Sequence, residues 1–126
     1  MLDPHPARPH VWQALSDFLP GIAHDDVQIS NRLRTDYGTI TAHDYVFYNS
    51  SDGIRVGFLE LVLCIHEPTV CIVATFDNTA RTDEWMECRA NEGIIMVPDT
   101  DMICSALCLV DRHMVEVYLP RFIRHH

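Results

Sequence analysis

The sequence predicts a mainly β fold, a small barrel or sandwich with one N-terminal helix. Two apolar runs, residues 54–65 and 70–76, meet at a short turn that contains a proline, which is typical of a β-hairpin. From Val56 onward the first run is interrupted only by Glu60, so both faces of this strand are expected to be covered. Simple alternation places Leu59, Leu61, Leu63 and Ile65 on one face, and Val56, Phe58, Val62 and Cys64 on the other.

The chain has 126 residues, the length of one domain that can bury a core without disulfides or metal. Residues 1–9 are rich in proline and histidine and are expected to form a solvated arm. Residues 10–120 are expected to form a single β-rich domain, and residues 121–126 a tail. No internal repeat or second domain is expected.

The predicted helix covers residues 10–19, where apolar side chains recur at helical spacing before a Pro-Gly pair. Val27 and Ile29 then alternate with polar residues, and Leu33 is expected to dock beside them. A turn-rich loop is expected at 49–53. The remaining strands are expected at 36–40, 45–48, 54–65, 70–76, 93–97, 102–110 and 113–119.

Residues 77–92 form the least regular stretch, with a net charge of −3 and one of the two tryptophans. A loop of this length inside a compact domain is more often functional than a simple connection. We therefore expect a functional loop here. The alternative is that residues 85–88 form a brief strand that faces the core.

Acidic residues dominate the body of the chain. Residues 36–120 hold four arginines and fourteen acidic residues, a net charge of −10, and the whole chain has a net charge of −9. All basic residues are arginine, which reflects either base-composition bias of the genome or a surface adapted to arginine-specific contacts. Nucleic-acid affinity comes largely from clustered cations, so no direct nucleic-acid binding is expected. The expected partner is a basic protein or peptide segment, for example a histone-like tail.

No apolar run reaches the length of about eighteen residues that a transmembrane helix needs. The first residues also lack the charged start and apolar centre of a signal peptide. We therefore expect an intracellular protein, nuclear or cytoplasmic, without membrane contact. The five cysteines, at positions 64, 71, 88, 104 and 108, are then expected to be reduced thiols.

The cysteines also raise the question of a metal site. Cys64, His66 and Cys71 would offer three ligand atoms across the hairpin, but structural zinc usually takes four. Cys104 and Cys108 are four residues apart on one predicted strand, about 13 Å along it, so they cannot share a metal ion. Free cysteine is among the most buried residue types. We expect core packing, with no metal and no cofactor.

No motif of a known catalytic chemistry is present. The sequence contains no Gly-x-Ser-x-Gly, no His-Glu-x-x-His and no glycine-rich phosphate loop with its lysine. Cys64 and Cys71 lie near His66, but an apolar hairpin in an acidic protein raises the pKa of a thiol. Acidic pairs such as Asp25-Asp26 fall in turn-like contexts, where solvation or helix capping is the usual reason for the two carboxylates. The chain is not expected to be an enzyme.

Aromatic side chains with acidic neighbours are the candidate partner-binding residues. Five rings could line a cage that attracts a cation: Tyr37, Tyr45, Phe47, Tyr48 and Trp85. The alternative is that Tyr45 and Phe47 alternate into the core and that Trp85 caps one end of the barrel. The candidate set consists of Trp85 as anchor, Asp83, Glu84 and Glu87 as an acidic rim, and Tyr37 and Tyr48 as further aromatic contacts.

The order of the expected elements resembles a small SH3-like barrel of the bromo-adjacent homology (BAH) kind. The resemblance lies in residues 37–47, a polar turn with Asp before a strand, and in 57–62, similar to the second strand of the family. Residues 93–98 and 102–107 are similar to its closing strands. It covers about two thirds of the chain, and His43 stands where the family commonly has glycine.

This resemblance implies a reader or scaffold module that binds proteins, often in a chromatin setting. Domains of this shape also occur inside transposon-encoded proteins. No binding residue of the family matches a position here. The sequence therefore favours a non-catalytic protein-interaction module with an acidic surface. The alternative is a structural or assembly domain from a larger polypeptide, for example a mobile-element protein.

Overall fold

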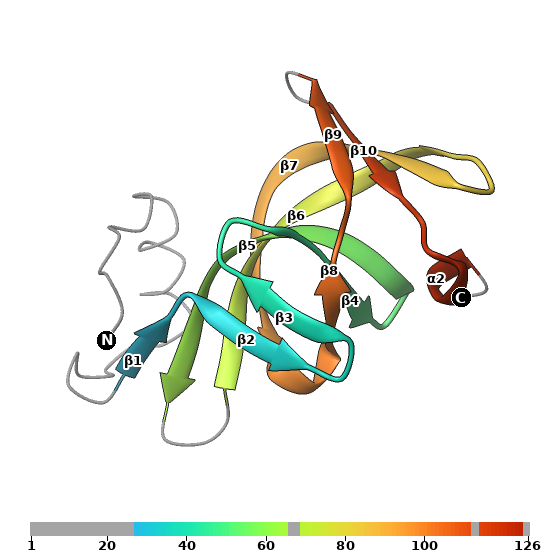
Figure 1. Cartoon of the computed structure of the whole chain (residues 1–126). Coiled ribbons are helices and arrows are strands. Elements are labelled where there is room, and N and C mark those ends of the chain that lie inside the picture. The colour runs from blue at the N-terminus through green and yellow to red at the C-terminus, as the bar shows by residue number, and fades with distance from the viewer. Residues whose placement is uncertain (1–26, 66–68, 112–113, 125–126) are drawn as a thin grey trace.

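The strands of the protein wrap into a strongly curled β structure in the computed structural model (Figure 1), which describes residues 27–65, 69–111 and 114–124. The mainly β class is confirmed. The predicted arm 1–9 and helix 10–19 lie outside the described residues. The elements are β1 (Val27–Ser30), β2 (Arg32–Thr35), β3 (Gly38–Thr41), β4 (Tyr45–Ser50), β5 (Gly53–Ile65), β6 (Thr69–Arg81), β7 (Trp85–Pro98), the 3-10 turn η2 (Asp99–Asp101), β8 (Met102–Ser105), β9 (Cys108–Asp111), β10 (Met114–Tyr118) and the short helix α2 (Arg121–Arg124).

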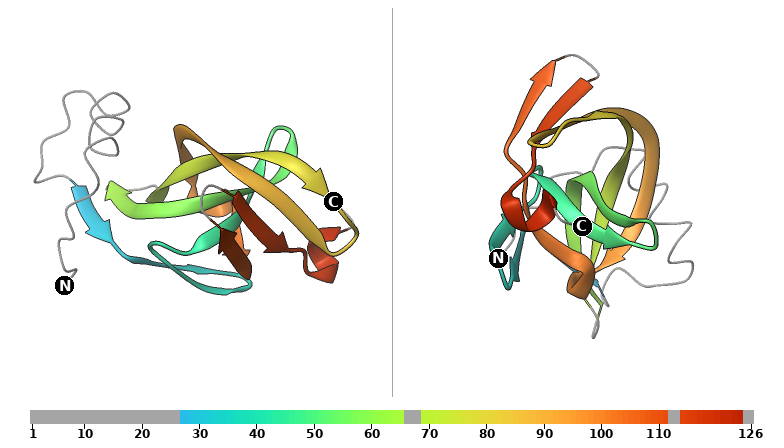
Figure 2. Two further views of the ribbon diagram at one scale, coloured as in Figure 1. Left: turned by 90° about the horizontal axis from the view of Figure 1, so that it is seen from above. Right: turned by 90° about the vertical axis from the view of Figure 1, so that its right-hand side faces the viewer.

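One antiparallel sheet runs in the order β8-β4-β5-β6-β7-β10-β9, with β1 beside the far end of β5, and β2 and β3 form a separate pair. β8 and β9 follow each other in the chain but occupy opposite ends of this order. At their junction the amide of Ala106 donates to the carbonyl of Tyr45 at 2.7 Å, and the amide of Tyr118 donates to the carbonyl of Leu107 at 2.9 Å. The two end strands of the sheet, β8 and β9, thus lie in one short segment, residues 102–111. The sheet must curl to bring its ends together, which gives it a barrel-like character (Figures 1 and 2).

β5 is buried along most of its length, as its continuous apolar run predicts. The simple alternation expected for it is wrong, because the register against β6 shifts between Leu59 and Leu61, at Glu60. A shift of one residue reverses the faces of a strand. Leu59 consequently packs in the same cluster as Val62, whereas Leu61 packs in a different cluster together with Leu63.

β4 separates two parts of the core. Phe47 belongs to one cluster, while its neighbours Val46 and Tyr48 belong to another. Since successive side chains of a strand point to opposite faces, apolar residues cover β4 on both sides. The first cluster reaches β6, β7, β10 and α2 through Phe76, Met86, Cys88, Val115, Val117, Leu119 and Ile123.

The segment 77–92, expected as a loop, is part of the β6–β7 hairpin instead, whose register shifts between Ala74 and Phe76 and between Asn78 and Ala80. β6 continues to Arg81 and β7 begins at Trp85, so the turn contains just Thr82, Asp83 and Glu84. The alternative of a strand at 85–88 is confirmed. Figure 1 shows this hairpin extending away from the rest of the sheet. Residues 77–81 are all exposed, so the strand carries no apolar alternation that the sequence could reveal.

The C-terminal part of the chain is more divided than expected. The predicted strand 102–110 consists of β8 and β9 with two residues between them, so Cys104 and Cys108 lie on separate strands. The expected tail begins with α2, where Ile123 is 3% exposed and packs in the core. Within the described ranges, no helix combines the length and apolar character required to span a membrane.

Candidate functional site

The turn of the β6–β7 hairpin carries the predicted anchor, Trp85, and part of its acidic rim. The amide of Thr82 donates to the carbonyl of Trp85 at 2.8 Å, and the amide of Trp85 donates to Oγ1 of Thr82 at 3.1 Å. These two bonds close the turn tightly. Asp83 and Glu84, at its tip, are exposed to solvent. Two of the predicted carboxylates are therefore available to a partner at this turn.

Trp85 is half-buried and packs against β10. Its ring meets the ring of Tyr118 edge-on, with centroids 5.7 Å apart and an interplanar angle of 69°. The amide of Leu119 donates to the carbonyl of Glu84 at 2.7 Å, which fixes the turn to the end of β10. We call the rings of Trp85 and Tyr118 the first aromatic pair.

Glu87 takes a different role from Asp83 and Glu84. It is half-buried, and its Oε1 accepts a hydrogen bond from Oγ1 of Thr79 across the hairpin at 2.9 Å. This carboxylate is therefore engaged within the hairpin. It adds negative charge to the surface, but its Oε1 already accepts a hydrogen bond from Thr79.

Tyr37 lies at the turn between β2 and β3, which Thr35 organises. Oγ1 of Thr35 accepts from the amide of Tyr37 at 3.1 Å and donates to the carbonyl of Ile103 in β8 at 2.7 Å. The ring of Tyr37 stacks on Phe122 of α2, with centroids 5.0 Å apart and planes within 4° of parallel. These two rings form the second aromatic pair, and the residues are 62% and 43% exposed.

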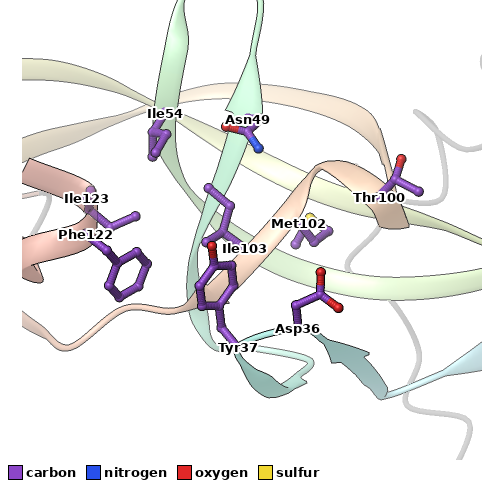
Figure 3. Close-up of a pocket in the computed structure, with 9 residues that line it drawn as sticks. All are labelled: Asp36, Tyr37, Asn49, Ile54, Thr100, Met102, Ile103, Phe122 and Ile123. Carbon is purple, nitrogen blue, oxygen red and sulfur yellow. The ribbon is translucent and has the colours of Figure 1, made fainter. Parts of the chain in front are cut away.

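A groove opens beside the second aromatic pair (Figure 3). Its volume is about 320 Å³, at the lower end of the range for small-molecule sites, so it suits a single side chain. Phe122 and Tyr37 lie together toward one end in Figure 3, and Thr100 lies at the other. The lining residues are Asp36, Tyr37, Asn49, Ile54, Thr100, Met102, Ile103, Phe122 and Ile123.

The two aromatic pairs are joined by one short stretch of chain, residues 118–122. Tyr118, at its start, touches Trp85, and Phe122, at its end, touches Tyr37. The Cα atoms of Tyr118 and Phe122 are four residue steps apart and can be separated by at most about 14 Å. Both pairs therefore lie within reach of one short peptide. We call residues 118–122 with both pairs the aromatic surface.

Charged side chains border the aromatic surface. The exposed Asp36 precedes Tyr37, and the exposed Asp83 and Glu84 precede Trp85. Arg121, also exposed, lies between the two pairs. Three carboxylates therefore border the pairs, together with the guanidinium groups of Arg121 and of Arg81, which is exposed and pairs with Met86 at the base of the turn.

The other rings of the expected cage do not join this surface. Tyr48 is 2% exposed and Phe47 is fully buried, because both pack in the core from β4. Tyr48 was predicted to contact a partner, and its burial makes it a core residue instead. Tyr45 is half-buried and meets Phe58 and Phe76. Tyr45 and Phe47, two residues apart on β4, point to the same side of the strand and pack in the same core cluster, as the alternative predicted.

The thiols show no sign of activation. Burial, followed by the charges of Asp99 and Cys64, raises the pKa of the Cys71 thiol to about 12. Burial also raises the pKa of Cys88 to about 11. Thiols with such values stay protonated at neutral pH and are weak nucleophiles and metal ligands. All five cysteines are unpaired, although Cys64, Cys104 and Cys108 are only half-buried rather than enclosed.

The described residues include just two members of the ligand set that was weighed against core packing. Cys64 and Cys71 lie on adjacent strands, but His66 is outside the described ranges. Within those ranges, no group of three or more His, Cys, Asp or Glu side chains is placed to hold a metal ion.

Tyr118 and Phe122, the ring partners of Trp85 and Tyr37, are not among the residues predicted from the sequence. Tyr118 was assigned to a strand, and Phe122 to a tail without a role. One signal for the latter was available, because Phe122 and Ile123 are adjacent apolar residues in a segment expected to be solvated. Such residues usually find a surface to pack on.

Comparisons with known proteins identify no relative. No known family matches the chain, and neither the curated proteins nor the solved structures contain a match. The function is therefore inferred from the aromatic surface and the groove.

Proposed function

We propose that this chain is a non-catalytic protein-interaction module that binds a basic segment of another protein. The observation that carries the proposal is the aromatic surface, where two ring pairs with acidic neighbours lie along residues 118–122. Tyr37 and Phe122 are exposed, Trp85 and Tyr118 are half-buried, and Tyr and Trp are enriched where proteins bind one another.

The charge of the chain favours a cationic partner. Lys or Arg side chains over an exposed ring face gain about 0.5–1 kcal/mol, and carboxylates beside the rings add attraction. The net charge of −9 also speeds the encounter with a basic segment and opposes the approach of nucleic acid. The partner is thus a basic peptide, bound in an extended form along residues 118–122.

The acidic charge favours a histone-like tail as the basic partner, and with the chromatin setting that the BAH-like resemblance implies, the module would act as a chromatin-type reader. A barrel-like sheet is compatible with this assignment. His43, which replaces the usual glycine of the family, has a φ of 75° in the left-handed region that glycine favours. The backbone at this turn thus keeps the conformation that glycine would adopt there.

The proposal is tested on an array of histone-tail peptides with acidic peptides as the reference. We expect the chain to bind the basic peptides. Trp85→Ala should weaken this binding by about tenfold or more, because an interface anchor is lost, whereas Trp85→Phe should retain most of it. Ala90→Ser, at an exposed position of β7 outside the aromatic surface, is the control and should bind normally.

The fold of each variant is checked by circular dichroism. If Trp85→Ala unfolds, Trp85 is a core residue. Tyr37→Ala, at an exposed position, then replaces it in the test and should weaken binding of the basic peptides. Equal binding of acidic and basic peptides would exclude the proposal.

A second candidate function is an assembly domain, and β9 favours it. Among the described residues β9 pairs with β10 alone, so it is an edge strand. Leu109 and Val110 on β9 are 63% and 55% exposed, and Leu107, just before it, is 71% exposed. Such an edge can pair with the same strand of a second copy. Light scattering that shows a dimer, dissociated by Leu109→Lys, would support this function.

A further inference from the structure

The groove beside the second aromatic pair presents a flat ring surface. Tyr37 and Phe122 stack nearly parallel, so each covers one face of the other, and their exposure leaves the outer side of the pair in contact with solvent. A planar cation can lie flat on such a face. Guanidinium groups do so readily, because they are planar and more weakly hydrated than an ammonium group.

The walls of the groove divide into an apolar and a polar part. Ile54, Met102, Ile103 and Ile123 supply apolar atoms on which the methylenes of a long side chain can pack. Asn49 and Thr100 add an amide and a hydroxyl that can accept hydrogen bonds (Figure 3).

Asp36 is the one ionised side chain among the nine residues that line the groove. Its carboxylate is exposed and lies beside Tyr37 in the chain. A carboxylate pairs with a guanidinium through two parallel hydrogen bonds, a geometry that an ammonium group cannot match. An anionic ligand would meet this same charge as repulsion. Arg121 precedes Phe122 but does not line the groove.

We propose that this groove takes an arginine side chain of the partner and prefers it to lysine. The guanidinium lies on the Tyr37–Phe122 pair and bonds to Asp36, while the methylenes rest on the apolar wall. The inference rests on the proposed function, because it names the residue by which the basic segment is anchored.

The test is an NMR titration of the isotope-labelled full chain with three peptides. They are Gly-Gly-Arg-Gly-Gly and the same peptide with lysine or with citrulline, the uncharged analogue of arginine, in the central position. We expect the arginine peptide to shift the amide signals of Tyr37, Asn49 and Phe122 in a saturable way. The lysine and citrulline peptides should bind about tenfold more weakly, since each lacks the planar charge.

Two matched variants check the role of the carboxylate. Asp36→Asn should weaken binding of the arginine peptide by about tenfold. Asp111→Asn removes the same charge from an exposed position on β9, outside the groove, and should leave the titration unchanged. Equal effects of the two variants would show that net charge, and not Asp36, holds the peptide, and would overturn the proposal.

The outcomes separate this inference from the proposed function. Equal binding of the arginine and lysine peptides at the groove overturns the arginine preference. Shifts confined to Asp83, Glu84 and Trp85 overturn the groove as the arginine site, while the interaction module remains. If no cationic peptide shifts any signal and the histone-tail peptides also fail to bind, both proposals fall.

Discussion

Cys71 shows how burial sets the chemistry of a single side chain in this protein. The residue is fully buried on β6, opposite Val62 of β5. Because its thiolate would lose hydration and face nearby negative charge, the pKa of the thiol is raised to about 12. The consequence is a neutral thiol that contributes packing at physiological pH.

This raised pKa predicts a loss of stability in alkali. Above pH 9.0, the ordinary pKa of the thiol, the unfolded chain releases the Cys71 proton while the folded chain keeps it until about pH 12. The free energy of unfolding should therefore fall with rising pH in that window, by up to about 1.4 kcal/mol per pH unit from this group.

Chemical denaturation at a series of pH values measures this slope. Cys71→Val should reduce the slope above pH 9.0 and leave the dependence below pH 8 as it was. The same slope in both proteins between pH 9 and about pH 11 would show that Cys71 does not cause it.

The candidate site was partly predictable at the level of single residues. Trp85 and Tyr37 carry the signal that the sequence analysis used, an aromatic residue beside acids, and both lie on the aromatic surface. Tyr48 carries a similar signal but is buried, since the side of β4 that faces the core depends on its pairing with β5 and β8. The adjacent apolar residues Phe122 and Ile123 indicate packing, but the stacking of Phe122 on Tyr37 joins distant parts of the chain, and no local pattern shows it.

The β4–β5–β6 region depends on close approach of neighbouring strands at Gly57. A Cβ atom at this position would overlap the side chain of Val73 and lie 3.0 Å from the carbonyl oxygen of Ala74. Gly57 pairs with Val46 on one side and Thr75 on the other, so neither neighbour can move freely. The glycine is therefore required by packing, at the centre of the sheet.

Gly57→Ala should lower the free energy of unfolding by about 1–3 kcal/mol, the usual cost of overpacking a core. Thermal or denaturant unfolding measures the change. Ala80→Val, at an exposed position of β6, is the control and should change stability by less than about 0.5 kcal/mol. If Gly57→Ala is as stable as the unchanged chain, the strands are less closely packed there than described.

The elements themselves were predictable where one apolar pattern decides them. The strands that become β5 and the first half of β6 are clear from the sequence, because burial on both faces requires a continuous apolar run. The register shift at Glu60 was not predictable, since it depends on how β5 pairs with β6. The outer half of the β6–β7 hairpin was missed because residues 77–81 are exposed on both faces and so resemble a loop.

At the scale of the whole molecule, the described residues combine a curled sheet with the aromatic surface, whose rings are exposed or half-buried. Residues 102–111 bridge the ends of the sheet, and α2 and the β2–β3 turn then lie where Phe122 can stack on Tyr37. No local pattern in the sequence reveals this meeting of three distant segments. It is a product of the topology.

The central claim is that the acidic chain binds a basic peptide through this surface. Calorimetric titration with an arginine-containing histone-tail peptide tests it most directly, with the same peptide carrying citrulline and acetyl-lysine as a neutral reference. The affinity for each peptide is measured at about 50 mM and at about 500 mM salt, because the higher salt concentration shortens the electrostatic screening length severalfold. We expect binding of the basic peptide that weakens at high salt, and little binding of the neutral one. Equal binding of both peptides, or no binding of the basic peptide at low salt, would contradict the claim.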